Sequence, residues 1–156
     1  MVKNVFKKLG KKQKNNKGFS LVELIVVIAI MAVLVGVLAP QLIKYVEKSR
    51  EATDIQTCDN IATALKTYYA DEEVSASATA TTTKVTVTLS KTELGTGADA
   101  AVKDAGLTKA KIKGTKWTSD TIKIEYNKAD GTITYTGDSP YYHSENDQFK
   151  KGAKTK

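Results

Sequence analysis

An apolar run of 16 residues, Leu24–Ala39, is the feature that most limits how this chain can fold. No polar side chain interrupts the run, and the 21 residues from Phe19 to Ala39 contain one charge, that of Glu23. A helix needs about 20 apolar residues to cross a bilayer, so this segment is long enough to do so. Because Glu23 lies near the start of the segment, its charge is tolerable in a membrane, but it requires a reason.

The basic charge of the chain is concentrated just before this run. The 156 residues carry 24 Lys and Arg, 17 Asp and Glu, and a formal net charge of +7. Seven of the lysines and none of the acids lie in residues 1–18, so the remainder carries 17 basic and 17 acidic groups. Lysines beside an apolar segment stay on the cytoplasmic side and favour anionic lipid, which places the chain after Pro40 outside. We therefore expect no nucleic-acid partner.

Two ordinary kinds of membrane segment are alternative interpretations of this pattern. A secretory signal peptide has a shorter apolar region, of about 7–15 residues, which ends in a small-x-small cleavage site. The nearest such site, at residues 37–39, is followed directly by Pro40, which is a poor position for a cleaved bond. A plain membrane anchor fits the length of the segment but leaves Glu23 unexplained.

The N-terminal sequence resembles that of type IV pilins and their pseudopilin relatives. The resemblance rests on KGFSLVE at residues 17–23, the apolar run after it and Pro40, with Glu23 as the fifth residue after Gly18. It implies that a prepilin peptidase cuts between Gly18 and Phe19 on the cytoplasmic face and N-methylates the new amine of Phe19. The apolar helix would then stay with the mature chain and form the core of a helical filament.

The resemblance assigns Glu23 to assembly, through pairing with the Phe19 amine of an adjacent subunit. An unpaired carboxylate in an apolar core would be desolvated, and a subunit out of register would leave both charges unpaired. The alternative is an ordinary interfacial glutamate near the end of an anchor. Pro40 lacks a backbone donor and clashes with the preceding turn, so we expect a helix kink or local unwinding there. Many family members have glycine where this chain has Ala32, and the extent of any melting stays open.

The sequence divides into four segments. Together they predict an α+β, pilin-like fold. Residues 1–18 form the cleaved leader, and residues 19–40 form the transmembrane and filament-core half of a long helix. Residues 41–70 continue this helix as an amphipathic half. Residues 71–156 form a C-terminal region of small antiparallel sheet with a flexible tail.

The amphipathic half has a stripe that we expect to be buried against the sheet, because apolar or small residues recur every three or four positions. This stripe contains Leu42, Tyr45, Val46, Ser49, Ala52, Ile55, Cys58, Ala62, Leu65 and Tyr69. The charged residues are expected on the other faces of the helix, and they are Lys44, Glu47, Lys48, Arg50, Glu51 and Asp54.

Alternation and β-branched residues predict the strands of the C-terminal region. The candidates are 85–89, 121–126 and 132–136, of which the last two are the clearest, and a weaker one is 111–117. The Asp-Gly step at residues 130–131 favours a hairpin loop over 127–131.

Three further segments have weaker patterns. A short helix is expected at 98–105, ending at Gly106. The Ser/Thr/Ala run at 75–83 is interpreted as an exposed loop. Beyond Pro140 the polar, Lys-rich end has little to bury, so we expect it to fray.

No catalytic motif stands out. Gly95–Ala100 matches the sequence pattern of a dinucleotide-binding glycine motif. No buried strand or βαβ unit is predicted around it, so a surface turn is the better interpretation. Cys58 and His143 are the single cysteine and histidine, and we interpret Cys58 as a small buried residue. We expect no enzyme activity, no catalytic residue, no cofactor and no intramolecular disulfide. The missing disulfide favours a Gram-positive type of pilin.

Two groups of polar residues are left open as binding candidates. One comprises the acids Asp130, Asp138, Glu145 and Asp147, whose spacing matches no EF-hand, so no metal site is expected. The other comprises Tyr135, Tyr141 and Tyr142, which would form an adhesive patch or pack in the core or at a sheet edge.

The resemblance predicts a structural subunit of an extracellular type IV pilus that supports adhesion, motility or biofilm formation. It implies self-association into a helical homopolymer, the prepilin peptidase, and a pilus assembly platform with its ATPase as partners. The precursor would lie in the cytoplasmic membrane with its N-terminus in the cytoplasm, and the mature chain on the cell surface. Two alternatives stay open: a pseudopilin of a type II secretion or DNA-uptake machine, and a membrane-anchored surface binding protein.

Overall fold

Two compact units make up the computed structural model of this chain, which describes residues 18–70, 83–95 and 99–153. One unit ends at Gln41, and the other, which we call the head, begins at Leu42. The predicted leader up to residue 17, the Ser/Thr/Ala run as far as residue 82 and the centre of the glycine motif lie outside the described residues.

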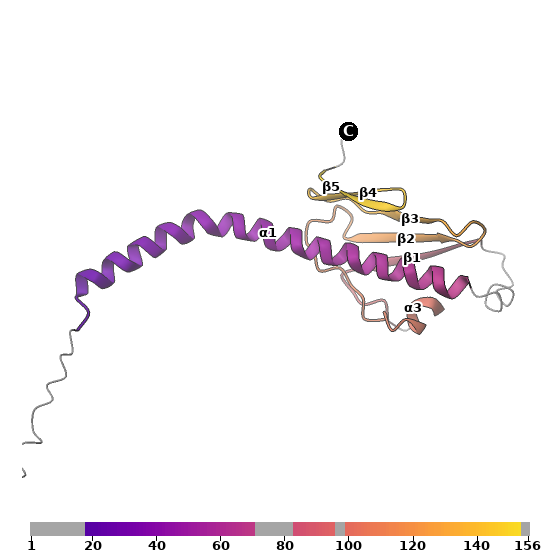
Figure 1. Cartoon of the computed structure of the whole chain (residues 1–156), viewed down its shortest axis with the longest axis horizontal. Helices are drawn as coiled ribbons and strands as arrows, with labels where there is room; N and C mark the ends of the chain where they lie inside the picture. Colours follow the sequence, from indigo (N-terminus) through magenta and orange to yellow (C-terminus); the bar gives the residue numbers. More distant parts are fainter. Residues whose placement is uncertain (1–17, 71–82, 96–98, 154–156) are drawn as a thin grey trace, which may run out of the picture. The chain divides into compact units, whose positions relative to one another are not determined.

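Helix α1 runs from Leu21 to Tyr69 and contributes residues to both units (Figure 1). The predicted long helix is confirmed, and its ends lie one or two residues inside the expected ones. Pro40 lies within the helix, with helical residues on both sides. The predicted unwinding is therefore not observed between Leu21 and Tyr69, and the kink at Pro40 stays a prediction.

In the first unit, the apolar half of α1 lies uncovered. Every residue from Gly18 to Leu38 is exposed, and none of the most apolar 18-residue window of the helix is buried against described residues. By length and composition this half is able to cross a membrane. Its burial is therefore left to a membrane or to other chains.

The head contains a three-stranded antiparallel sheet in the order β1-β2-β3. Its strands are β1 (Lys84–Ser90), β2 (Thr121–Asn127) and β3 (Ile133–Thr136), which confirms the predictions at 85–89, 121–126 and 132–136. The predicted hairpin loop joins β2 to β3, where the Gly131 N–H donates to the Asn127 carbonyl oxygen at 2.8 Å. Gly131 has a φ of +71°, a left-handed conformation that glycine adopts without strain.

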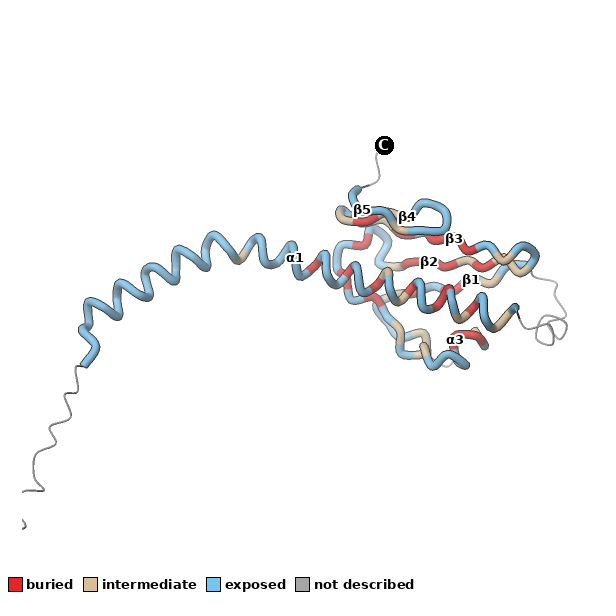
Figure 2. Tube along the Cα trace, viewed as in Figure 1, coloured by how far each residue is buried: buried red, intermediate tan, exposed pale blue. Residues whose placement is uncertain are grey.

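A single apolar core joins the second half of α1 to the sheet, as the buried residues in Figure 2 show. Alternate residues of β2 point inward, which is the period of a strand with one buried face. Each fully buried Ile or Leu side chain contributes about 1.5–3 kcal/mol. The core residues are Cys58, Ile61, Ala62, Leu65, Val87, Leu89, Ala101, Val102, Ile112, Trp117, Ile122, Ile124, Tyr126, Ile133, Tyr135 and Tyr142.

The short helix α3 (Ala100–Asp104) lies within the predicted range. Its first turn is capped by Asp99, whose Oδ1 accepts a hydrogen bond from the Ala101 N–H at 2.9 Å. Gly106 follows the helix with a φ of +69°, which ends it where the sequence predicted.

The strand predicted at 111–117 does not form. This segment lies as an irregular loop against α1, with Ile112 and Trp117 buried in the core. The prediction was wrong because the N–H groups of residues 113–115 donate to carboxylates of α1 and not to a neighbouring strand.

The fraying predicted beyond Pro140 is also wrong for the residues that the structure describes. The strands β4 (Tyr142–Glu145) and β5 (Gln148–Lys151) form an antiparallel hairpin there. Tyr142 and Ser144 are buried, and the ring of Phe149 lies 5.1 Å from that of Tyr135 and 5.8 Å from that of Trp117. A few inward side chains are therefore enough to fix an otherwise polar segment.

Candidate functional site

The residues of the predicted cleavage site lie just before α1. Gly18 is exposed, and Phe19 exposes 88% of its surface. A Cβ atom added to Gly18 would meet no heavy atom within 4 Å, so the described fold does not itself require glycine there.

Glu23 lies in the first turn of α1 and is exposed. Its Oε2 accepts a hydrogen bond from the Ser20 N–H at 2.8 Å, and a serine three residues before a glutamate is the sequence of a capping box. The contact satisfies one of the donors left free at the start of the helix. Glu23 therefore has a local role in the isolated chain, besides the assembly role that the resemblance implies.

A second polar site lies on the head half of α1, on a face that the sequence reasoning assigned wrongly. The predicted stripe is confirmed at Cys58, Ala62 and Leu65, which are buried. In the preceding turns the prediction was wrong: Glu47, Glu51 and Asp54 are buried, whereas Leu42 and Tyr45 of the stripe expose 63% and 69% of their surface. The three acids are four and three residues apart, so they share one face of the helix. We call Glu47, Glu51 and Asp54 the carboxylate clasp, because they hold the C-terminal part of the head.

Asp54 accepts three hydrogen bonds from the loop that follows α3. Its Oδ1 accepts from the Lys113 N–H at 2.8 Å. Its Oδ2 accepts from the Gly114 N–H at 2.7 Å and from the Trp117 indole N–H at 2.9 Å. A buried carboxylate with three donors is compensated for the water it has lost.

Glu47 is held by the same loop and by a cation. Its Oε1 accepts a hydrogen bond from the Thr115 N–H, and its Oε2 lies 3.6 Å from a guanidinium nitrogen of Arg50. Burial alone would raise the pKa of Glu47, but the hydrogen bonds from Thr115 and the Arg50 charge outweigh it and hold the pKa below the ordinary value near 4.5. Glu47 therefore works as a charged carboxylate.

Glu51 has fewer partners than its two neighbours. Its Oε2 accepts a hydrogen bond from Ser139 Oγ at 2.5 Å, and the same hydroxyl oxygen accepts from the N–H groups of Tyr141 and Tyr142 at 3.1 and 3.0 Å. Its Oε1 is buried with no hydrogen-bond partner among the described residues. Burial, together with the charges of Glu47 and Asp54, raises the pKa of Glu51 despite the hydrogen bond from Ser139.

Gly114 is required where the loop meets the clasp. A Cβ atom there would lie 2.8 Å from Glu51 Cγ, 2.8 Å from Trp117 Nε1 and 2.9 Å from Asp54 Oδ2. Only a residue without a side chain lets the backbone approach both carboxylates so closely.

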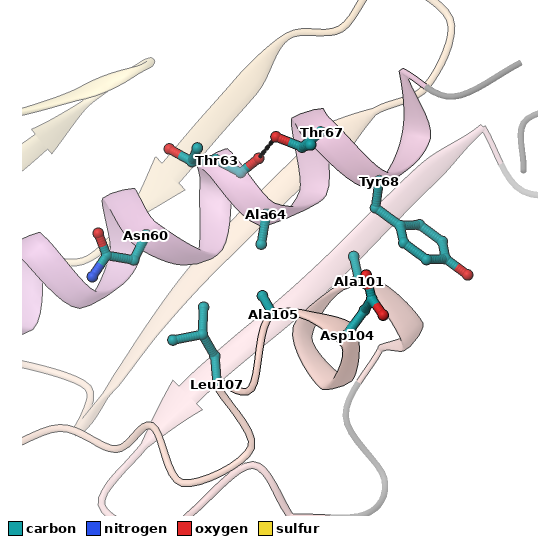
Figure 3. Close-up of a pocket in the computed structure, with 9 residues that line it drawn as sticks. All are labelled: Asn60, Thr63, Ala64, Thr67, Tyr68, Ala101, Asp104, Ala105 and Leu107. Carbon is teal, nitrogen blue, oxygen red and sulfur yellow. Dashed lines mark hydrogen bonds between the residues drawn. The ribbon is translucent and has the colours of Figure 1, made fainter.

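An open groove of about 690 Å³ lies between the second half of α1 and α3 (Figure 3). Ala64 of α1 faces Ala105 and Leu107 across it, and Tyr68 lies toward one end. Its described lining has no His, Cys or Lys, and the hydroxyls of Thr63 and Thr67 donate to backbone carbonyl oxygens of α1. The remaining lining residues are Asn60, Thr63, Thr67, Ala101 and Asp104.

The other candidates from the sequence do not gather into a site. Cys58 is a free thiol that is fully buried, as predicted, and burial raises its pKa. His143 lies on β4, where its Nδ1 is 3.0 Å from the Gly152 carbonyl oxygen. No group of three His, Cys, Asp or Glu side chains within 18–70, 83–95 and 99–153 is arranged to hold a metal ion.

Four of the acids and tyrosines left open by the sequence have structural roles. Asp130 Oδ1 accepts from the Thr132 hydroxyl at 2.7 Å in the hairpin turn, and Glu145 pairs with Lys150 at 2.6 Å. Tyr135 and Tyr142 are buried, which confirms core packing and not an adhesive patch for these two.

The carboxylate clasp is the site that sequence reasoning missed. Its signal was present in the spacing of Glu47, Glu51 and Asp54, which places three acids on one helix face. Charged residues are rarely buried unless they are paired, which is why a rule based on residue type places these acids on the outer faces of the helix.

Comparisons with known proteins match parts of the chain. Residues 13–39 match the prokaryotic N-terminal methylation motif. A protein from Clostridium perfringens (strain 13 / Type A), named prepilin peptidase-dependent protein A, is 41% identical over 71 residues. That stretch is 44% of this chain and 50% of the relative, so the match spans about half the relative's length. No solved structure matches this chain.

These findings confirm the resemblance stated for the N-terminus. The matched residues contain Gly18, Phe19 and Glu23 and most of the apolar half of α1. Together with the α+β arrangement they support a protein of the type IV pilin or pseudopilin kind, with a precursor anchored in the membrane by α1.

Proposed function

We propose that this chain, with its prepilin type of N-terminus, is the structural subunit of an extracellular type IV pilus. The observation that carries the proposal is the uncovered apolar half of α1, most of which lies within the methylation motif. A fold that leaves so much apolar surface exposed needs a membrane or further copies to cover it. A membrane would cover this half before assembly, and neighbouring subunits afterwards.

The proposed processing step is a cut between Gly18 and Phe19 by a prepilin peptidase, followed by methylation of the new amine. The name of the clostridial relative states that it depends on such a peptidase. Gly18 supports this step because no neighbouring atom would contact a side chain there, so its glycine fits a requirement of processing better than one of folding.

In the proposed assembly, residues 1–18 are removed and residues 19–40 become the filament core. Residues 41–70 connect this core to the surface, and residues 71–156 complete that surface. Glu23 would pair with the Phe19 amine of the next subunit, and Pro40 would give a kink. Assembly in this scheme needs a platform and an ATPase, and the subunit itself performs no catalysis.

The intact mass of the membrane-extracted chain tests the processing step. In cells with a prepilin peptidase, the wild type should give the 138 residues from Phe19 onward plus one methyl group. The Gly18→Val variant should keep its leader, whereas the control Gly36→Ala should be cut normally, because a Cβ at Gly36 meets no atom within 4 Å. A shortened Gly18→Val chain would exclude this cut site, and an uncut wild type would favour an anchored surface protein.

Electron microscopy of the same cells then tests the pilus. Long surface filaments labelled by an antibody against the head, at wild-type expression, are the expected result. A cut and methylated chain that never enters such filaments would instead indicate a pseudopilin.

A further inference from the structure

Glu51 is a fully buried acid of the head whose two carboxylate oxygens do not both have a hydrogen-bond partner among the described residues. It exposes 0% of its surface, and its Oε1 has no partner among the described residues. Asp54, which is equally buried, accepts three hydrogen bonds, whereas Glu51 accepts one from Ser139. An ionised carboxylate in this position would keep one buried oxygen without any donor, which costs more than a neutral acid group.

The carboxylates of Glu47 and Asp54 beside Glu51 increase this penalty. On its own helix, Glu47 and Asp54 place two further carboxylates beside it, and the guanidinium of Arg50 pairs with Glu47. The loop after α3 brings Lys113 and Lys116, whose side chains are exposed. The remaining elements bring Asp138, which precedes Ser139, and the half-buried His143 of β4. None of the ion pairs formed by the described residues includes Glu51.

We propose that Glu51 holds a proton in the folded head and makes the carboxylate clasp a pH-sensitive latch between α1 and the C-terminal part of the chain. When the proton leaves, a third negative charge appears between Glu47 and Asp54 in a buried site. The proton goes to solvent, and no other bond changes. The latch weakens because this charge must be hydrated or released from its enclosure.

The direction of the pH effect follows from the raised pKa of Glu51. A folded-state pKa above the ordinary value near 4.5 stabilises the fold at low pH, and this contribution is lost as the pH rises through the raised value. Between the two values, the unfolding equilibrium constant rises about tenfold per pH unit for one proton. Glu47 has the opposite effect: its lowered pKa gives a contribution that is lost as the pH falls below about 4.5.

Ser139 connects Glu51 to the start of the β4–β5 hairpin through hydrogen bonds. Its hydroxyl donates to Glu51 and accepts from the N–H groups of Tyr141 and Tyr142 at the start of β4. Loss of the Glu51 contact therefore frees the hydroxyl that orients this turn. The same clasp includes Trp117, whose indole N–H donates to Asp54.

Trp117 reports on the latch because it is the single tryptophan of the chain. The experiment is urea unfolding of the full-length chain in detergent micelles, followed by tryptophan fluorescence between pH 4 and pH 9. We expect the wild-type midpoint to fall as the pH rises, with the midpoint of Glu51→Gln nearly constant over the same range above pH 5. The amide is uncharged and keeps an oxygen for the Ser139 hydroxyl.

The matched control is Glu47→Gln, on the same helix face one turn earlier. It should lower stability at neutral pH and still show a decline as the pH rises, displaced to lower pH because one of the two charges beside Glu51 is gone. A wild-type midpoint that does not fall above pH 5, or an equal fall in Glu51→Gln, would overturn the proposal. The carboxyl carbon shift of Glu51 in isotope-labelled wild type gives a second readout that needs no variant. Titration clearly above 4.5 is expected, and titration at or below 4.5 would overturn the latch.

Discussion

At the scale of single residues, the loops of the head are attached to the second half of α1 through polar contacts. These contacts lie inside the core of the head. The Trp117 indole nitrogen lies 2.9 Å from Asp54 Oδ2, while the ring of Trp117 packs edge-on against Phe149. The same carboxylate accepts the N–H groups of Lys113 and Gly114. Removal of one partner from such a buried network leaves a desolvated group unpaired, and this costs about 1–3 kcal/mol.

The first prediction concerns Gly114. The Gly114→Ala change places a methyl group within 2.9 Å of Glu51, Trp117 and Asp54, so the loop must move away from the clasp. Overpacking of this kind costs about 1–3 kcal/mol in the free energy of unfolding. Urea unfolding followed by Trp117 fluorescence measures the change.

The control for this prediction is Lys113→Ala, whose exposed side chain leaves the backbone donor to Asp54 in place. It should alter the free energy of unfolding by less than about 0.5 kcal/mol. Equal stability of Gly114→Ala and wild type would show that the loop accommodates a side chain without loss of the clasp.

At the scale of secondary-structure elements, local pattern predicted the sheet well and the loops poorly. β2 alternates Ile122, Ile124 and Tyr126 inward, and this period-2 pattern is visible in the sequence. Residues 111–117 include similar residue types, but backbone N–H groups of this segment donate to an acid about 60 positions earlier in the chain. A hydrogen-bond acceptor so distant in the sequence does not affect the local alternation of apolar and polar residues. The segment could therefore not be recognised as a loop.

The β4–β5 hairpin was missed for a related reason. Its residues are mostly polar, and the contacts that fix it are made by the few that face inward, such as Tyr142, Ser144 and Phe149. The N-terminal site was predictable because its motif is contiguous, whereas the clasp depends on the pairing of α1 with two loops. The spacing of the three acids places them on one helix face, but nothing in the spacing indicates that this face is buried.

The second prediction tests how the hairpin is held. Phe149→Ala removes a half-buried ring that contacts Trp117 and Tyr135, and it should cost about 2 kcal/mol of stability. Hydrogen exchange of the amides in β4 and β5 should accelerate, because the hairpin loses an apolar contact with the core.

The exposed Lys151 on the same strand provides the control for the hairpin. The Lys151→Ala variant should exchange its β4 and β5 amides at the wild-type rate. Slow exchange in Phe149→Ala would instead assign the stability of the hairpin to its backbone pairing and to Ser144.

At the scale of the whole molecule, the precursor and the proposed mature chain differ most in charge. Residues 1–18 carry seven lysines, and the chain from Phe19 onward has equal numbers of acidic and basic side chains. The cut would therefore remove the side chains that hold the N-terminus in the cytoplasm. It would also create one amine beside an apolar helix whose nearest carboxylate in sequence is Glu23.

The third prediction separates the local and the assembly roles of Glu23. Glu23→Gln keeps an oxygen that can accept from the Ser20 N–H but removes the charge that would pair with the Phe19 amine. Normal processing with strongly reduced filaments is expected, since each 1.4 kcal/mol lost per contact weakens that contact about tenfold. Intact mass and sheared-filament yield measure the two effects.

Glu93→Ala is the control for Glu23→Gln, because Glu93 forms an exposed pair with Lys111 at 3.4 Å. Exposed pairs contribute little to stability, so this variant should assemble normally. Wild-type filament yield from Glu23→Gln would exclude charge pairing at this position.

The contacts of the clasp with the loop after α3 have a consequence for sequence divergence. Asp54 binds the backbone N–H groups of Lys113 and Gly114, and every residue except proline supplies such a donor. The side chains of Lys113 and Lys116 point to solvent and take no part in an ion pair that the structure describes. Homologous chains can therefore replace these two lysines by almost any residue, and so change the outer chemistry of the head, while its attachment to α1 stays the same.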